Sequence, residues 1–183
     1  VCSSDLISEQ QTAIGHAVRF VYLMTGVAHL ARLSQDEGKR QDCLRLWKNM
    51  AQRQLYITGG IGSQSSGEAF SCDYDLPNDS VYAESCASIG LMMFARRMLE
   101  MEADSQYADV MERALYNTVL GGMALDGKHF FYVNPLEVHP KSLKFNHIYD
   151  HVKPVRQRWF GCACCPPNIA RVLTSIGHYI YTP

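Results

Sequence analysis

The segment Trp159-Phe-Gly-Cys-Ala-Cys-Cys-Pro-Pro-Asn168 places three thiols within four residues, directly before two prolines. Proline is well tolerated in the first turn of a helix, so the segment predicts a helix that begins at Pro167 or Asn168. A residue before proline favours extended geometry, and we therefore expect Cys165 and also Cys164 to be extended. The thiols would then lie just outside a helix N-terminus, where the macrodipole and the free amides favour thiolate over thiol.

Two ordinary interpretations of these thiols compete with a chemical one. A disulfide between Cys164 and Cys165 would be strained, because adjacent residues rarely reach the geometry of a bridge. Three inert buried thiols are the other alternative, since free cysteine is often buried. We favour a metal site or a nucleophile over both. The seven cysteines are odd in number and clustered, which indicates a reducing compartment, and we expect a cytoplasmic protein.

Composition limits the classes of partner. The chain has 183 residues, of which 47% are hydrophobic, and this is enough to bury the core of one domain. The net charge is −1 and no basic run occurs, so we expect neither a nucleic-acid nor a membrane partner. No apolar segment has the length that spanning a bilayer requires.

Apolar periodicity predicts a mainly α protein built from layered helices. Asp104 is the expected N-cap of one helix, and Ser8 with Gln11 forms a possible capping box for another. The pair Asp126-Gly127 predicts a β-hairpin that joins residues 123–125 to residues 129–133. The helices are expected at about 8–34, 36–55, 83–102 and 104–118 and after Asn168.

A further thiol lies in Glu84-Ser-Cys86. Residues two apart point to different sides of a regular helix, but in an extended or first-turn geometry they share a face. Glu84 and Cys86 could then join Cys164 and Cys165 in a set of one carboxylate and three thiolates. Such a set suits tetrahedral zinc.

Seven motifs together resemble glycoside hydrolase family 127, the family of β-L-arabinofuranosidases and their relatives. The resemblance covers nearly the whole chain after Leu6. The motifs are Tyr56-Ile-Thr-Gly-Gly-Ile-Gly-Ser63, Gly67-Glu-Ala-Phe70, Tyr74-Asp-Leu-Pro-Asn-Asp79, Tyr82-Ala-Glu-Ser-Cys-Ala-Ser88, Ala108-Asp-Val-Met-Glu-Arg-Ala-Leu-Tyr-Asn117, Phe130-Phe-Tyr-Val-Asn-Pro-Leu-Glu137 and Cys162-Ala-Cys-Cys-Pro-Pro-Asn168.

The resemblance implies a partial (α/α)6 barrel, a six-hairpin toroid, with the short β-hairpin as an insertion. Residues 1–183 would form a single partial domain, the C-terminal portion of the barrel, without the β-sandwich domains that follow it in the family. Other substrate-binding histidines of the family lie upstream of Val1, so we expect the chain alone to be inactive. Half a toroid would expose the inner faces of its helices, so we also expect poor solubility.

The resemblance also implies roles for individual residues. Cys164 would be the nucleophile and Glu68 the general acid/base, while His16 and Tyr132 would contact the sugar. The zinc ligands would be Glu84, Cys86, Cys164 and Cys165. We expect the ligands around Glu68, together with its partial burial, to keep this carboxyl protonated for acid catalysis.

The implied function is a retaining glycosidase that cleaves β-L-arabinofuranosides in an oligosaccharide or glycopeptide. The alternative is a non-catalytic protein whose one glutamate and three cysteines form a structural zinc site. Without the resemblance, Glu68 could equally be a solvated loop carboxylate, and Tyr132 would be a packing aromatic. Trp159 is expected in the core. Cys43, Cys72 and Cys162 are interpreted as structural.

Overall fold

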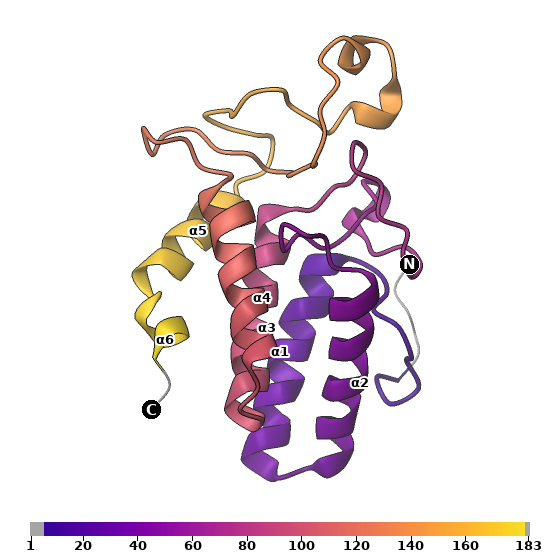
Figure 1. Ribbon diagram of the computed structural model, residues 1–183, viewed down its shortest axis with the longest axis vertical. Coiled ribbons are helices and arrows are strands. Elements are labelled where there is room, and N and C mark those ends of the chain that lie inside the picture. Colours follow the sequence, from indigo (N-terminus) through magenta and orange to yellow (C-terminus); the bar gives the residue numbers. More distant parts are fainter. Residues whose placement is uncertain (1–5, 182–183) are drawn as a thin grey trace.

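The computed structural model describes residues 6–181, which form a mainly α structure of six α-helices (Figure 1). Helix α3 packs against α1, α4 and α5, and α2 packs on α1. None of the helices in this described part combines the length and the apolar character that crossing a membrane would need. The helices are α1 (Ala17–Ser34), α2 (Glu37–Arg53), α3 (Ser85–Met101), α4 (Ser105–Ala114), α5 (Cys165–Thr174) and α6 (Gly177–Ile180).

The core forms where α2, α3 and α4 meet. Trp47 of α2 makes edge-on contacts with Phe94, at 5.4 Å between ring centroids, and with Tyr107, at 5.0 Å. Leu46 and Met50 are fully buried beside Trp47. The helix predicted at 36–55 therefore buries an apolar face in the core. Edge-on aromatic pairs contribute about 1 kcal/mol beyond the burial of their area.

The N-cap predicted at Asp104 is confirmed, and α2 begins at an aspartate cap as well. The side chains of Asp36 and Asp104 accept hydrogen bonds from backbone N–H groups of α2 and α4, as N-caps do. The expectation that the first helix begins near Ser8 is wrong, because α1 begins at Ala17. Gly15 has a φ of 80°, which a helix does not accommodate, and the N–H of Ala13 donates to Asn49 instead of to the helix.

The predicted β-hairpin is also wrong, since no strand is assigned between residues 6 and 181. The turn itself forms: Gly127 has a φ of 66° and its N–H donates to Ala124 at 2.9 Å. Beyond the single bridge between Met123 and Phe130, the backbone hydrogen bonds of residues 129–133 are made with residues outside the expected hairpin. Phe130 pairs with Gln157, and the carbonyl of Tyr132 accepts from Ser85, so the two arms separate.

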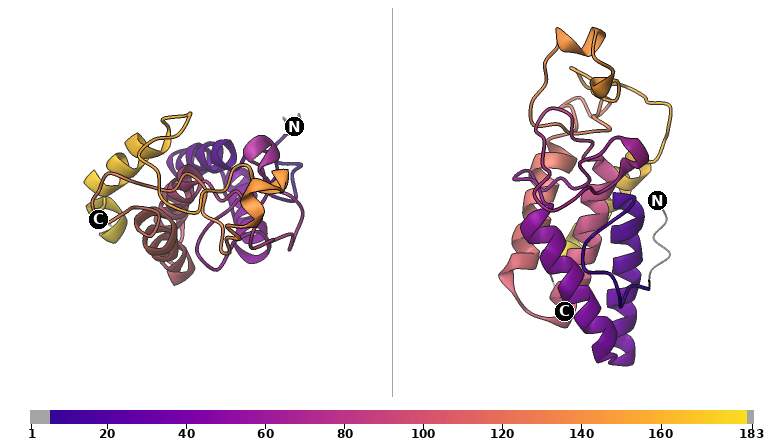
Figure 2. Two further views of the ribbon diagram at one scale, coloured as in Figure 1. Left: turned by 90° about the horizontal axis from the view of Figure 1, so that it is seen from above. Right: turned by 90° about the vertical axis from the view of Figure 1, so that its right-hand side faces the viewer.

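Two long connections gather at one end of the helices (Figures 1 and 2). They comprise residues 54–84 and 121–164 and contain only short helical turns. The starts of α1, α3 and α5 lie at this same end. The fold therefore places the N-termini of three helices beneath the loops.

The outer face of α1 predicts how the isolated 183-residue chain behaves. Leu23, Leu30 and Leu33 are more than half exposed on this face. Because an apolar patch of this kind favours association, we expect the isolated chain to form oligomers that dissociate when the three leucines are replaced by glutamate. Sedimentation velocity would measure this. The matched control Gln52→Glu adds charge on a polar surface and should leave the oligomers intact; a monomeric unsubstituted chain would contradict the prediction.

Candidate metal and active site

Three helix N-caps meet under the loops. His16 precedes α1, Glu84 precedes α3 and Cys164 precedes α5. None of these three side chains makes a capping hydrogen bond to its own helix. Each is instead directed at the side chain of another element, and the positive ends of the helix dipoles at this point favour negative charge.

One carboxylate and three thiols form a compact cluster, which confirms that the two distant segments meet. The ligand atoms of Glu84, Cys86, Cys164 and Cys165 all lie within 4.8 Å of one another. Oxygen Oε1 of Glu84 is 3.2 Å from the sulfur of Cys164 and 4.0 Å from that of Cys165. The sulfur of Cys165 is 3.6 Å from that of Cys86 and 3.8 Å from that of Cys164.

These separations fit a metal ion and not a disulfide. A disulfide requires sulfurs about 2.05 Å apart. Tetrahedral coordination with metal–sulfur bonds of about 2.3 Å places sulfurs about 3.8 Å apart, and the measured sulfur–sulfur distances match this. Glu84, Cys86 and Cys165 are buried and Cys164 is half-buried. The cluster could therefore hold a metal ion.

The four groups of the cluster shift one another's pKa values. Burial, together with a charged Cys86, raises the pKa of the Glu84 carboxyl to about 9. Hydrogen bonding with Cys165 lowers the pKa of Cys86 to about 6 and raises that of Cys165. Burial raises the pKa of Cys164. Four buried anions repel one another, so without a cation most of the cluster keeps its protons.

The local conformation differs from the prediction at the cysteine pair. Cys164 has helical angles, with φ −73° and ψ −38°, and α5 begins at Cys165, so the expectation that both residues are extended is wrong. Pro166 lies within the first turn, where a missing N–H removes no intrahelical bond. Glu84 has the extended geometry, φ −60° and ψ 138°, that lets it share a face with Cys86.

Glu68 lies beside this cluster and is held at both oxygens. Nε2 of His16 is 3.0 Å from Oε2 of Glu68, and the hydroxyl of Tyr82 donates to Oε1 at 3.0 Å. Ligand atoms of His16, Glu68 and Glu84 lie within 4.8 Å of one another. Glu68 is thus a loop carboxylate fixed next to a metal-binding set, and His16 contacts this carboxylate.

Tyr132 connects the cluster to a cleft. Its hydroxyl lies 3.0 Å from the sulfur of Cys164. It also lines a cleft of about 350 Å³, together with Glu68, Tyr82, Phe160 and Cys162. Glu68 and Tyr132 therefore border one open space, and the hydroxyl of Tyr132 contacts the sulfur of Cys164.

Sequence reasoning missed two polar residues of the site. Tyr82 holds Glu68, and Asn168 donates from Nδ2 to the sulfur of Cys86 at 3.0 Å. Both lie inside the quoted motifs, at Tyr82-Ala-Glu84 and Pro166-Pro-Asn168, which is the signal that could have pointed to them. Cys162 is exposed on the cleft and does not have the structural role expected of it, whereas Cys43 is buried.

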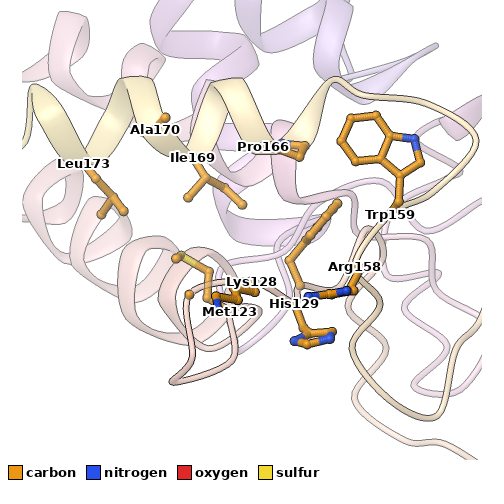
Figure 3. A pocket seen from close by; sticks show the side chains of 11 residues that line it. Met123, Lys128, His129, Arg158, Trp159, Pro166, Ile169, Ala170 and Leu173 are labelled. Atoms are coloured by element: carbon orange, nitrogen blue, oxygen red, sulfur yellow. The ribbon is translucent and has the colours of Figure 1, made fainter.

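A second cavity, of about 340 Å³, lies between α5 and the turn around Gly127 (Figure 3). Its floor is apolar, with Ile169 and Leu173 on one side, and Trp159 and Arg158 stand at its edge. Trp159 is 63% exposed, so the expectation of a core tryptophan is wrong. Neither Glu68 nor Tyr132 lines this cavity, whereas both line the first cleft, and we assign the chemistry to that first cleft.

Known proteins match both the sequence and the fold. The model of the β-L-arabinofuranosidase GH127 catalytic domain matches residues 4–178. A non-reducing end β-L-arabinofuranosidase of Bifidobacterium longum subsp. longum is 51% identical over 180 residues, which are 98% of this chain and 27% of the relative. The chain therefore spans about a quarter of the length of this relative.

Solved structures of the family have the same arrangement. A GH127 β-L-arabinofuranosidase from Geobacillus stearothermophilus T6 superposes with a TM-score of 0.94 at 60% identity, over 97% of this chain and 28% of that one. A second GH127 β-arabinofuranosidase superposes with a TM-score of 0.85 at 42% identity, over 96% and 26% of the two chains. The chain belongs to the catalytic domain of glycoside hydrolase family 127.

Proposed function

We propose that the protein containing this chain is a retaining glycosidase that cleaves β-L-arabinofuranosides from oligosaccharides or glycopeptides. The observation that carries the proposal is that ligand atoms of both Cys164 and Glu68 lie within 4.8 Å of Glu84. Glu68 also lines a cleft together with Tyr132, whose hydroxyl contacts the sulfur of Cys164. The named relatives act on this class of sugar. In the whole protein, these helices would form the later part of an (α/α)6 barrel. A cluster of reduced thiols favours a cytoplasmic location.

The metal that suits the donor set is zinc. Three thiolates and one carboxylate are ligands that zinc accepts in tetrahedral sites. Glu84, Cys86, Cys164 and Cys165 would hold the ion, whose positive charge would keep Cys164 as a thiolate at neutral pH. Asn168 holds the sulfur of Cys86 from outside the set, and such supporting hydrogen bonds orient metal ligands.

In the first step, the sulfur of Cys164 attacks the anomeric carbon while Glu68 gives its proton to the departing oxygen. The bond between the sugar and its leaving group breaks, and a thioglycoside with Cys164 forms. In the second step, Glu68 removes a proton from water, which displaces the sulfur and releases the sugar. Two displacements retain the configuration. Cys164 is suited to this role because Cys86 and Cys165 are buried and Cys164 is only half-buried.

His16 and Tyr132 would orient the substrate. Both reach the reacting groups, His16 at Glu68 and Tyr132 at Cys164. A hydroxyl 3.0 Å from the sulfur can also donate to a thiolate as the leaving sulfur regains its charge. These contacts favour a productive orientation of the sugar between sulfur and carboxyl.

A covalent adduct tests the nucleophile. We expect the full-length protein, treated with an activated β-L-arabinofuranoside, to gain the mass of one arabinosyl group on the peptide that contains Cys164. Mass spectrometry after proteolysis would locate it. Cys164→Ser should lose the adduct, and the control Cys72→Ser, which changes an exposed cysteine outside the cluster, should keep it. Absence of both turnover and adduct would favour the structural-zinc alternative, and turnover without an adduct on Cys164 would exclude Cys164 as the nucleophile.

The ligand set predicts which substitutions remove the metal. Because a ligand carries much of the binding free energy, we expect Cys86→Ala and Cys165→Ala to lose stoichiometric zinc from the full-length protein. Elemental analysis of the purified protein would measure this. Cys43→Ala, which alters a buried cysteine remote from the cluster, is the matched control. Unchanged zinc content in the ligand variants would place the metal elsewhere.

The raised pKa values predict the pH dependence of zinc binding. Without metal, Glu84 and Cys164 hold their protons at neutral pH, and zinc has to displace them. The apparent affinity therefore falls as the pH falls, by about tenfold per pH unit for each proton released. Competition with a chelator should show binding at least about a hundredfold weaker at pH 6 than at pH 8. An affinity that does not change over this range would contradict the prediction.

A further inference from the structure

Tyr82 contacts the group that the proposed reaction uses for proton transfer. Its hydroxyl donates to Oε1 of Glu68 at 3.0 Å, while His16 contacts the other oxygen, Oε2. Tyr82 belongs neither to the metal-binding set nor to the expected sugar contacts. Burial raises its pKa, so the hydroxyl stays protonated and remains a donor.

The ring of Tyr82 is itself fixed. It meets the ring of Tyr132 edge-on, at 6.2 Å between centroids, and lies at 5.7 Å from the ring of His151. Its backbone N–H donates to Ser63, and its carbonyl accepts from the N–H of Asn134, both at 3.2 Å. Tyr132 in turn contacts the sulfur of Cys164. Tyr82 therefore joins the carboxylate side of the site to the sulfur side.

The backbone around Glu68 is fixed, but the orientation of its carboxyl group depends on contacts with other side chains. Glu68 has a φ of 50°, in the left-handed region, directly after Gly67 with a φ of 73°. Bonds in both directions between Gln64 and Ala69 hold this backbone turn. Backbone strain persists where the surroundings fix it, and it is often found at functional sites. The carboxyl group beyond it rotates easily, since the terminal torsion of glutamate has a broad, two-fold profile.

We propose that Tyr82 is a positioning residue, which holds Oε1 of Glu68 and so keeps Oε2 as the oxygen that carries the transferred proton. The inference rests on the proposed function, in which Glu68 is the general acid/base. Rotation of the carboxyl would exchange its two oxygens and move the proton away from the departing oxygen. The hydroxyl of Tyr82 prevents this rotation. Removing the hydroxyl should therefore weaken the transfer of a proton from Glu68 to the leaving group.

Leaving-group dependence in the full-length protein tests this role. A 4-nitrophenyl group departs with little acid assistance, whereas an alkyl group needs a full proton. We expect Tyr82→Phe to lower kcat/KM for an alkyl β-L-arabinofuranoside about tenfold or more, as expected for a lost hydrogen bond to a charged group. For the 4-nitrophenyl substrate the loss should stay below about threefold. The ratio of the two values does not depend on the fraction of folded enzyme.

Two parallel variants separate the possible outcomes. Tyr56→Phe removes a comparable hydroxyl, which donates to the carbonyl of Pro77 at 3.1 Å, and it should leave the ratio unchanged. Glu68→Gln should shift the ratio more than Tyr82→Phe. If Glu68→Gln shifts the ratio and Tyr82→Phe leaves it within about twofold, the positioning role is wrong and the proposed function stands. If neither variant shifts it, both are wrong.

Discussion

The structure depends on four acidic side chains whose ligand atoms lie within 4.8 Å of one another, three of them buried and one half-buried. Glu84, Cys86, Cys164 and Cys165 repel one another once they are ionised, and burial removes the water that would screen them. Helix dipoles supply part of the compensation, because α3 and α5 both begin here. A bound cation would supply the rest.

The packing of α3 brings the ligands together. Glu84 and Cys86 stand at its start, and α5 lies against it. Ile169 and Val172 anchor α5 in the core, and Cys165 at the first position of the helix is fully buried. The apolar contacts between the helices thus determine where the sulfurs stand. The loops then carry Glu68 and Tyr132 to the same place.

Local patterns in the sequence predicted much of this arrangement. Apolar periodicity predicted the helices, and Asp36 and Asp104 stand at their starts because their side chains bond to the first turn. The metal-binding set was predicted from residue types, since one carboxylate and three thiols suit few other purposes. Glu68 was predicted only from the family motifs, because the residues around it do not distinguish it from a solvated loop carboxylate. Its contacts with His16 and Tyr82 are long-range and leave no local pattern.

Two of the wrong predictions, the start of the first helix and the β-hairpin, share a physical cause, which is competition from distant partners. Asn49 holds Ala13 outside the helix, and Gln157 and Ser85 bond to the segment that should have paired as a hairpin. Cys164 is helical although the cysteine pair precedes proline, because Pro166 in the first turn removes no helical hydrogen bond.

X-ray absorption at the zinc edge of the full-length protein tests the central claim most directly. The account predicts three sulfur neighbours at about 2.3 Å and one oxygen at about 2.0 Å. Loss of one sulfur neighbour is expected in Cys164→Ser. A metal surrounded only by nitrogen and oxygen, or one whose sulfur count is unchanged in Cys164→Ser, would contradict the account.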